Sequence, residues 1–319
     1  MADPAPTHIP VLLKPVLELL APAPGETAVD ATAGLGGHAV AIAERIGPTG
    51  TLVLFDLDPG NLERAAARVN ALTSPPKVVT HHASFADAPR ILAGAGLSAD
   101  LVLADLGFAS PQVDDASRGF SFSRDGPLDM RLNPSAPITA AELVNTLPEL
   151  ELAEMIRDLG EEPWPLAKRI ASKIGQSRAT GPISRTAQLA SVVRSALPSR
   201  RPGHSIDPAT KTFQALRIAV NDELGSLNAL LSAVERASSA GSSGGAVGGV
   251  RSWLKGGARV GVISFHSLED RPVKQSFARL VERGVAAELT RKPVTASDQE
   301  LGLNPRARSA KLRAIRVLF

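Results

Sequence analysis

The 319-residue sequence contains no cysteine, and this absence excludes disulfide bonds, thiolate zinc sites, iron–sulfur clusters and a cysteine nucleophile. Aromatic residues are scarce as well, at 3% of the chain. No apolar run approaches the roughly eighteen residues of a membrane span, and the N-terminus lacks the basic and apolar regions of a signal peptide. The histidines are too scattered to suggest a metal site. We therefore expect a cytoplasmic protein with neither a membrane partner nor a bound metal.

The charges are distributed unevenly along the chain. Residues 1–160 carry 10 lysines and arginines against 20 acidic residues, whereas residues 161–319 carry 25 against 12. The formal net charge is only +3, but positive charge gathered in one part of a chain favours a polyanionic partner such as a nucleic acid. A solvated basic surface is the alternative explanation.

Strand-like runs alternate with helical stretches at the start of the chain. The four runs cover residues 27–31, 51–56, 77–81 and 100–105. This alternation predicts an α/β fold with a doubly wound, mostly parallel Rossmann-like sheet. The ligand crevice of such a sheet lies at the carboxyl ends of its strands, which is where Asp30, Asp56 and Asp105 fall.

The alternation stops after residue 106. Residues 107–204 are predicted to form an inserted helical domain, with an acidic helix at 148–162 and a basic helix at 165–177. Residues 1–106 and 205–319 would then form the domain that contains the sheet. The other predicted elements are helices at 10–20, 212–237 and 268–284, a flexible Ser/Gly-rich loop at 238–249, a strand at 259–265 and a final edge strand at 311–318.

A glycine-rich turn joins the first predicted strand to the helix that follows it. Gly34, Gly36 and Gly37 lie within four residues, a pattern that is typical of nucleotide-binding turns. Asp30 stands before the turn and would repel a phosphate, so it favours a phosphate-free cationic ligand such as S-adenosylmethionine (SAM). Asp56 ends the second strand and is placed to bind the ribose hydroxyls of SAM or of a dinucleotide. Binding of NAD or FAD and a purely structural turn are the alternatives.

An acidic residue also ends the fourth predicted strand. Asp105 runs directly into Leu-Gly-Phe-Ala-Ser-Pro. Enzymes that methylate exocyclic amines usually place an acid or amide here, because an aniline-like nitrogen must be held by hydrogen-bond acceptors and directed at the methyl group. Asp105 is therefore the candidate catalytic acceptor. The alternative is that it binds only the amino acid part of the cofactor.

Two phenylalanines stand out between residues 118 and 131. Phe120 and Phe122 are flanked by glycines and by Arg118 and Arg131, as in loops that stack a base and hold phosphates. The alternative is that both rings anchor the loop on the core.

A further cluster, residues 264–271, follows the strand expected at 259–265. His266 would face the crevice, where an imidazole can accept a proton or bond a base edge, while Ser267 and Asp270 resemble a helix capping box. Several basic residues at polar positions are candidates for phosphate contacts: Lys211, Arg217, Arg306, Arg308, Lys311 and Arg313.

Taken in order, these motifs resemble those of the bacterial 16S ribosomal RNA cytosine-N4 methyltransferases, the RsmH/MraW family. The resemblance rests on Gly-Leu-Gly-Gly-His38, on the loops that begin at Asp105 and Arg118, on Thr212-Phe-Gln-Ala-Leu-Arg217 and on residues 264–271. It implies that SAM is held by Gly36, Gly37, His38, Asp56, Phe85, Asp105 and Gln112. The candidate substrate-binding residues are then Arg118, Phe120, Phe122, Arg131, Arg217, His266, Arg271, Arg306 and Arg308. The turn departs from the family, which often has Thr-Phe-Gly-Arg-Gly where this chain has Thr-Ala-Gly-Leu-Gly.

The resemblance implies direct transfer of the SAM methyl group to N4 of a decoding-centre cytosine in 16S rRNA of the small ribosomal subunit. The lack of cysteine argues against methylation at C5, which normally needs a cysteine nucleophile. The target base must be unstacked, at a cost of roughly a few kcal/mol. The alternatives are a methyltransferase acting on DNA or protein, an NAD-dependent oxidoreductase and a non-enzymatic ribosome-assembly factor.

Overall fold

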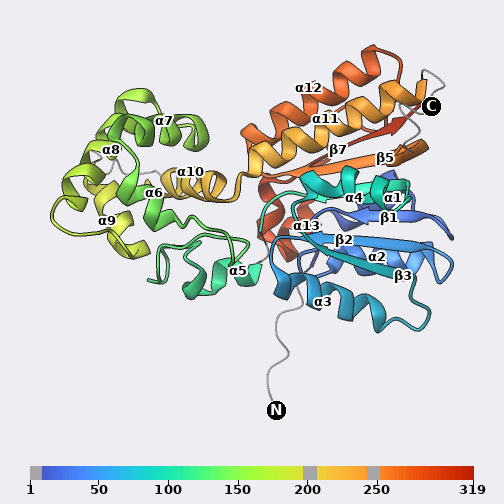
Figure 1. Ribbon diagram of the computed structural model, residues 1–319, viewed down its shortest axis with the longest axis horizontal. Coiled ribbons are helices and arrows are strands. Elements are labelled where there is room, and N and C mark those ends of the chain that lie inside the picture. The colour runs from blue at the N-terminus through green and yellow to red at the C-terminus, as the bar shows by residue number, and fades with distance from the viewer. Residues whose placement is uncertain (1–8, 109, 197–206, 243–251) are drawn as a thin grey trace. The chain divides into compact units, whose positions relative to one another are not determined.

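The computed structural model describes residues 9–108, 110–196, 207–242 and 252–319. The chain divides into two compact units. Met1–Gly107 and Leu224–Phe319 form one, which we call the sheet unit, and Phe108–Glu223 form the other, the helical unit. Figure 1 shows the elements of both units in chain order.

Within the described residues, the sheet unit contains a seven-stranded sheet in the order β3-β2-β1-β4-β5-β7-β6. The strands are β1 Thr27–Asp30, β2 Thr51–Asp56, β3 Lys77–His82, β4 Ala99–Asp105, β5 Leu254–Ser264, β6 Ala286–Glu288 and β7 Lys311–Val317. Strands β1 to β5 run parallel, and β7 is antiparallel to both β5 and β6. The predicted doubly wound, mostly parallel α/β fold is confirmed. The strand order reverses between β1 and β4, which is where such sheets bind ligands.

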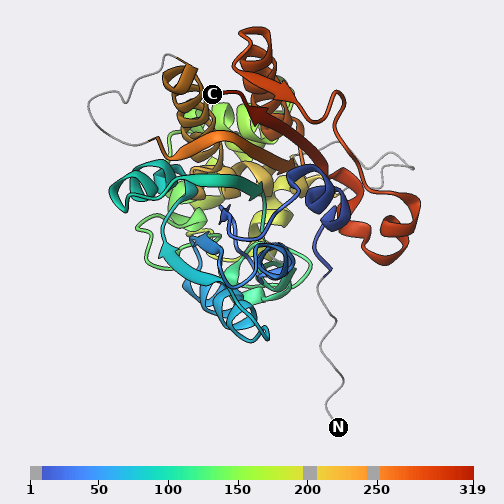
Figure 2. The same ribbon diagram turned by 90° about the vertical axis from the view of Figure 1, so that its right-hand side faces the viewer.

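Helices cover both faces of this sheet (Figure 2). They are α1 Leu13–Leu20, α2 Gly37–Ile46, α3 Pro59–Asn70, α4 Ala88–Gly94, α11 Glu223–Ser242, α12 Ser267–Glu282 and α13 Asp298–Leu303. Side chains alternate across a strand, so Val53 and Phe55 of β2 enter one apolar cluster while Leu52 and Leu54 enter the other. Two buried cores therefore hold the strands in place and fix where their carboxyl ends lie.

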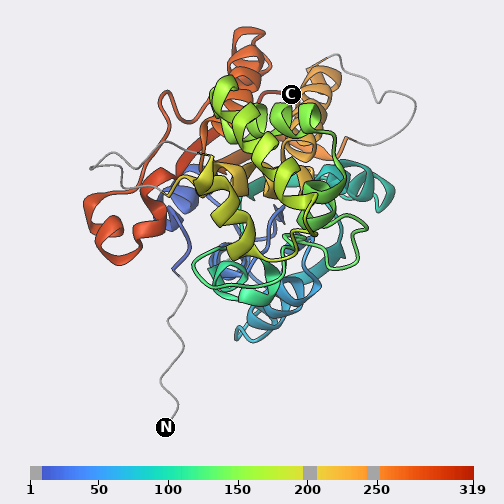
Figure 3. The same ribbon diagram turned by 90° about the vertical axis from the view of Figure 1, so that its left-hand side faces the viewer.

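The helical unit consists of six helices in its described part (Figure 3). They are α5 Ser110–Asp114, α6 Ala140–Thr146, α7 Glu149–Gly160, α8 Trp164–Arg178, α9 Thr186–Ser195 and α10 Ala209–Asn221. The predicted acidic and basic helices correspond to α7 and α8. A separate core that includes Ile156, Ile170 and Leu216 joins α7, α8 and α10. Because α10 packs here, the helical unit extends to Glu223, whereas the sequence suggested a boundary at 204.

The prediction of one helix over residues 212–237 is wrong. The chain forms α10 and α11, separated by Asp222 with a left-handed φ of 47°. No proline or glycine marks the break, and the apolar spacing continues through it. The break is held by Asn221, whose side chain donates to the Met130 carbonyl and accepts from the Leu132 amide. Such contacts with a distant loop leave no local sequence signal.

Two other predicted elements also need correction. Helix α11 continues to Ser242, so residues 238–242 are helical rather than part of a loop; residues 243–249 of that predicted loop lie outside the described residues. Strand β7 is not an edge strand, because β6 pairs with its other side. With only three residues, β6 is too short to show the alternation that identifies a strand. No helix in the described part of the chain is both long and apolar enough to cross a membrane.

Candidate active site

Three acidic residues end three neighbouring strands of the sheet unit. Asp30 ends β1, Asp56 ends β2 and Asp105 ends β4. Because β1 lies between β2 and β4, the three carboxyl groups gather at the edge of the sheet where the strand order reverses. The sequence prediction of an acidic crevice at this edge is consistent with this arrangement.

The glycine-rich turn between β1 and α2 is fastened to its surroundings on two sides. The Gly34 amide donates to Asp56 Oδ2 at 2.8 Å. Gly36 has a φ of 78°, and a Cβ at this position would lie 2.8 Å from the Cα of Ala65 in α3. A Cβ on Gly37 would lie 2.8 Å from the ring of Pro10. Gly36 and Gly37 are therefore required by close packing of α3 and of the N-terminal segment against the turn.

Burial keeps these carboxyl groups from ionising easily. Asp30 is 1% exposed, and burial raises its pKa to about 7, with a smaller contribution from the charge of Asp56. Burial likewise raises the pKa of Asp56 to about 6, although backbone amides of Asp58 and Gly34 oppose the shift. The pKa of Asp105 lies well above its usual range because of burial and then the charges of Asp30 and Glu269.

The three carboxyl groups have no basic side chain paired with them. In the part of the chain that the structure describes, no lysine or arginine forms an ion pair with Asp30, Asp56 or Asp105. Asp30 Oδ2 and Asp105 Oδ1 are buried and accept no hydrogen bond from the described residues. Buried carboxylates are costly without a cation or a donor, so this edge of the sheet is suited to a ligand that brings both.

The side chain of His38 lies between Val11 and Asp105. The residue is 6% exposed, its Nε2 lies 2.9 Å from the Val11 carbonyl oxygen and its Nδ1 lies 3.5 Å from Asp105 Oδ2. The Asp105 amide donates to Thr32 Oγ1 at 2.7 Å. His38 was predicted from the sequence, whereas Thr32, which lies inside the glycine motif, was not. Val11 acts through its backbone and leaves no sequence signal.

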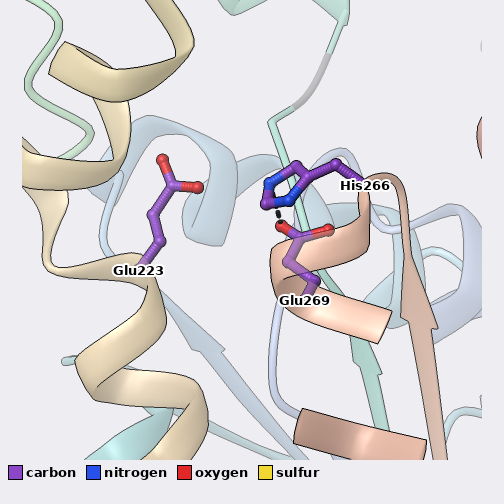
Figure 4. Close-up of side chains that lie close together, drawn as sticks. All are labelled: Glu223, His266 and Glu269. Carbon is purple, nitrogen blue, oxygen red and sulfur yellow. Dashed lines mark ion pairs between the residues drawn. The ribbon is translucent and has the colours of Figure 1, made fainter. Parts of the chain in front are cut away.

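His266 and Glu269 form a second polar pair at the end of β5 (Figure 4). Their Nε2 and Oε1 atoms lie 3.1 Å apart, and the Phe265 amide donates to Glu269 Oε2 at 2.7 Å. Glu269 is 2% exposed and was not singled out from the sequence. Figure 4 also draws Glu223, at the start of α11.

The capping box expected at Ser267 is not formed. His266 is the N-cap residue of α12 and Ser267 is its first helical residue. Asp270 instead forms a bidentate ion pair with Arg313 and lies 3.6 Å from Lys311 Nζ. Both cations were candidates for phosphate contacts; they share one carboxylate, which offsets only one of their two positive charges.

Comparison with known proteins identifies the family. A model of the MraW methylase family matches residues 5–318. The chain belongs to this family.

Ribosomal RNA small subunit methyltransferase H of Acidobacterium capsulatum is 46% identical to it, over 96% of this chain and 97% of that protein. The protein of the same name from Geobacter sulfurreducens is 45% identical, over 97% of this chain and 98% of that protein, and the one from Syntrophotalea carbinolica is 46% identical, over 98% of both. Membership of the MraW methylase family makes the chain a methyltransferase and confirms the resemblance drawn from the motifs.

Several predicted site residues of this MraW family member lie in the helical unit. Each of them has partners inside that unit. Arg118 donates to the carbonyls of Arg131 and Leu132, and Arg131 forms a bidentate ion pair with Asp129. Arg217 forms a bidentate pair with Glu223 at 2.7 Å. These contacts account for the position of each side chain without RNA. The roles of these arginines in RNA binding stay predictions.

The two phenylalanines of the same loop also pack within the helical unit. Phe120 stacks on Phe108, with ring centroids 5.9 Å apart, and Phe122 meets Phe213 edge-on at 4.8 Å. Both rings lie against the core of the unit. This packing favours the anchoring alternative over base stacking.

The other predicted residues are distributed between the units. Phe85 begins a 3-10 turn after β3 and packs against the core of the sheet unit. Gln112 is buried in the helical unit. Arg271, Arg306 and Arg308 are exposed on the sheet unit.

Proposed function

We propose that this methyltransferase transfers a methyl group from SAM to N4 of a cytosine in 16S rRNA of the small ribosomal subunit. The observation that carries the proposal is that Asp30 Oδ2 and Asp105 Oδ1, at the carboxyl ends of β1 and β4, are buried and accept no hydrogen bond from the described residues. The methylase family and the names of the relatives support the reaction and the substrate class. We also propose that the enzyme acts in the cytoplasm, where ribosomal RNA is made.

The crevice is suited to SAM rather than to a dinucleotide. SAM carries a sulfonium and an ammonium group and no phosphate, so it supplies positive charge beside Asp30. A pyrophosphate would meet the negative charge of Asp30 instead. The family resemblance assigns further contacts to Gly36, Gly37 and His38 at the turn, Asp56 at β2, and Phe85 and Gln112 beyond it.

The reaction requires orientation rather than a covalent intermediate. The N4 lone pair of cytosine is delocalised into the ring, so an acceptor that holds an N4 hydrogen helps to direct the lone pair at the methyl carbon. Asp105 Oδ1 is such an acceptor, since it is buried and accepts no hydrogen bond from the described residues. We therefore assign the catalytic role to Asp105.

The phosphate backbone of the substrate requires basic residues around the crevice. Arg271, Arg306 and Arg308 are exposed on the sheet unit, and we propose that they contact RNA phosphates. Such contacts position the RNA without reading its sequence. The unstacked base itself would be held by Asp105 and His266.

The decisive test is methyl transfer with defined substrates. Purified enzyme and SAM with a labelled methyl group are incubated with small ribosomal subunits that lack this modification, and the rRNA is digested for nucleoside mass analysis. We expect N4-methylcytidine at a single position. Methylation confined to naked DNA or to protein would refute the substrate, and tight NAD binding without SAM binding would refute the cofactor. Wild-type modification by Asp105→Ala would refute the assigned role of Asp105.

A further inference from the structure

The imidazole of His38 is held between two groups of opposite character. Its Nε2 lies 2.9 Å from the Val11 carbonyl oxygen, and its Nδ1 lies 3.5 Å from Asp105 Oδ2. A carbonyl oxygen can only accept a hydrogen bond, so Nε2 carries a hydrogen and donates it. His38 is the second residue of α2, where the helix dipole disfavours a positive charge. With its Nε2 hydrogen donated to Val11, a His38 that holds no second proton directs the lone pair of Nδ1 at Asp105.

This geometry places the two carboxyl oxygens of Asp105 in different surroundings. A lone pair opposite an ionised carboxylate is repulsive, so the arrangement is stable when one proton lies between Nδ1 and Oδ2. The titratable groups that act on Asp105 are His38 from α2, Asp30 from β1 and Glu269 from α12. The two carboxylates favour a proton on Asp105. Oδ2 is then turned toward His38, and Oδ1 accepts no hydrogen bond from the described residues.

We propose that His38 is a positioning residue for Asp105: it engages Oδ2 and so leaves Oδ1 as the acceptor for the exocyclic amine. This inference rests on the function proposed above. In the transfer, the amine lone pair forms the new N–C bond while the C–S bond breaks and its electrons remain on sulfur. The methylated nitrogen then loses a proton to Oδ1 as the proton on Oδ2 passes to Nδ1. His38 ends the step as an imidazolium and releases that proton to water.

The orientation of His38 depends in turn on residues 9–12, which we call the N-terminal strap. The Leu12 amide donates to Glu300 Oε1 at 2.6 Å, and Asn304 Nδ2 donates to the Ile9 carbonyl at 3.1 Å. Leu12 has a φ of 53°, a conformation that a leucine keeps only when its surroundings impose it. Residues near the C-terminus thus fix the carbonyl that selects the His38 tautomer.

Two substitutions at His38 separate its contacts. In His38→Gln, the amide nitrogen can still donate to the Val11 carbonyl, but nothing replaces Nδ1 opposite Asp105. In His38→Asn, an amide group stands near the position of Nδ1 and the contact with Val11 is lost. We expect His38→Gln to lower kcat roughly 100-fold, a larger effect than the one on KM for SAM, and to move the acidic limb of the kcat–pH profile by about one pH unit. His38→Asn should recover about tenfold of this loss.

A pair of variants in α13 tests the strap. Glu300→Ala removes the acceptor of the Leu12 amide, while Asp298→Ala removes a carboxylate of the same helix for which the structure gives no contact with the strap. Glu300→Ala should lower kcat about tenfold and move the same pH limb. Asp298→Ala should leave both unchanged.

Measurements on the wild-type enzyme separate a failure of the proposed function from a failure of the positioning role of His38. If it neither binds SAM in calorimetry nor methylates small ribosomal subunits, the proposed function fails. If it does both, and folded His38→Gln keeps the wild-type kcat and pH profile, the positioning role of His38 is refuted. Loss of SAM affinity with unchanged kcat in that variant would also refute it, since His38 would then serve binding alone.

Discussion

The close contact between Gly36 and helix α3 gives a prediction whose size follows from the geometry. In Gly36→Ala the new methyl group meets the Ala65 Cα at 2.8 Å, and the alanine must keep a φ of 78°. A left-handed conformation costs an alanine about 1–2 kcal/mol, and overpacking against backbone adds roughly 1–3 kcal/mol. The expected loss in the free energy of unfolding is therefore about 2–5 kcal/mol.

Gly284 offers a matched control for the backbone part of this loss. It follows the C-terminus of α12 with a φ of 68°, and a Cβ there would meet no atom within 4 Å. The pattern Gly284 N to Val281 O and Val285 N to Leu280 O is that of a left-handed helix cap. Gly284→Ala should cost only about 1–2 kcal/mol. The difference between the two variants measures the contact with α3.

The two tryptophans make the measurement specific to one unit. Trp253 is buried in the sheet unit and Trp164 lies in the helical unit. In a Trp164→Phe background, urea unfolding followed by tryptophan fluorescence reports the sheet unit alone. Equal losses for Gly36→Ala and Gly284→Ala would refute the reasoning, because the close approach of Ala65 would then have no energetic consequence.

Three further predictions concern charge and packing. Because the pKa of Asp30 is raised to about 7, the folded state binds more protons than the unfolded state between about pH 4 and pH 7. The SAM-free protein should therefore lose stability as pH rises through this range, by at most about 4 kcal/mol from this residue. Asp30→Asn should flatten the dependence of the free energy of unfolding on pH, measured by urea unfolding, and should weaken SAM binding. An unchanged dependence on pH would contradict this prediction. The double variant Arg306→Ala/Arg308→Ala should weaken binding to small ribosomal subunits and reduce the salt slope of log K by about two; an unaltered slope in a filter-binding titration would exclude phosphate contacts at these sites. Phe122→Ala should destabilise the helical unit by about 2–4 kcal/mol, as read from Trp164 fluorescence, whereas a loss of RNA affinity at constant stability would restore the base-stacking interpretation.

The parts of the fold that the sequence could predict are those with a periodic signal. The runs that became β1 to β4 were placed to within one residue. Strands β1, β2 and β4 are buried and form continuous apolar segments bounded by turns, whereas β3 is a partly exposed strand. Asp30, Asp56 and Asp105 followed from the same reasoning, since a residue that ends such a strand must lie at the ligand edge of the sheet.

The parts that the sequence could not predict depend on contacts between distant residues. The break at Asp222 depends on a loop near residue 130, and β6 exists only as a partner of β7. At the site, His38 forms its hydrogen bond with the backbone carbonyl of Val11, a group that any residue at position 11 would supply. The RNA contacts of Arg131 and Arg217 stay predictions, but the sequence alone did not show that these side chains form ion pairs with Asp129 and Glu223.

The position of β5 in the chain has a consequence for biosynthesis. Strand β4 pairs with β1 on one side and with β5 on the other, yet the ribosome makes the whole of residues 108–223 before it reaches β5. At roughly 5–20 residues per second, one apolar edge of the nascent sheet stays open for on the order of ten seconds. An open strand edge invites pairing with other chains, so the growing polypeptide needs shielding during this interval, and the helical unit is complete before the catalytic sheet can close.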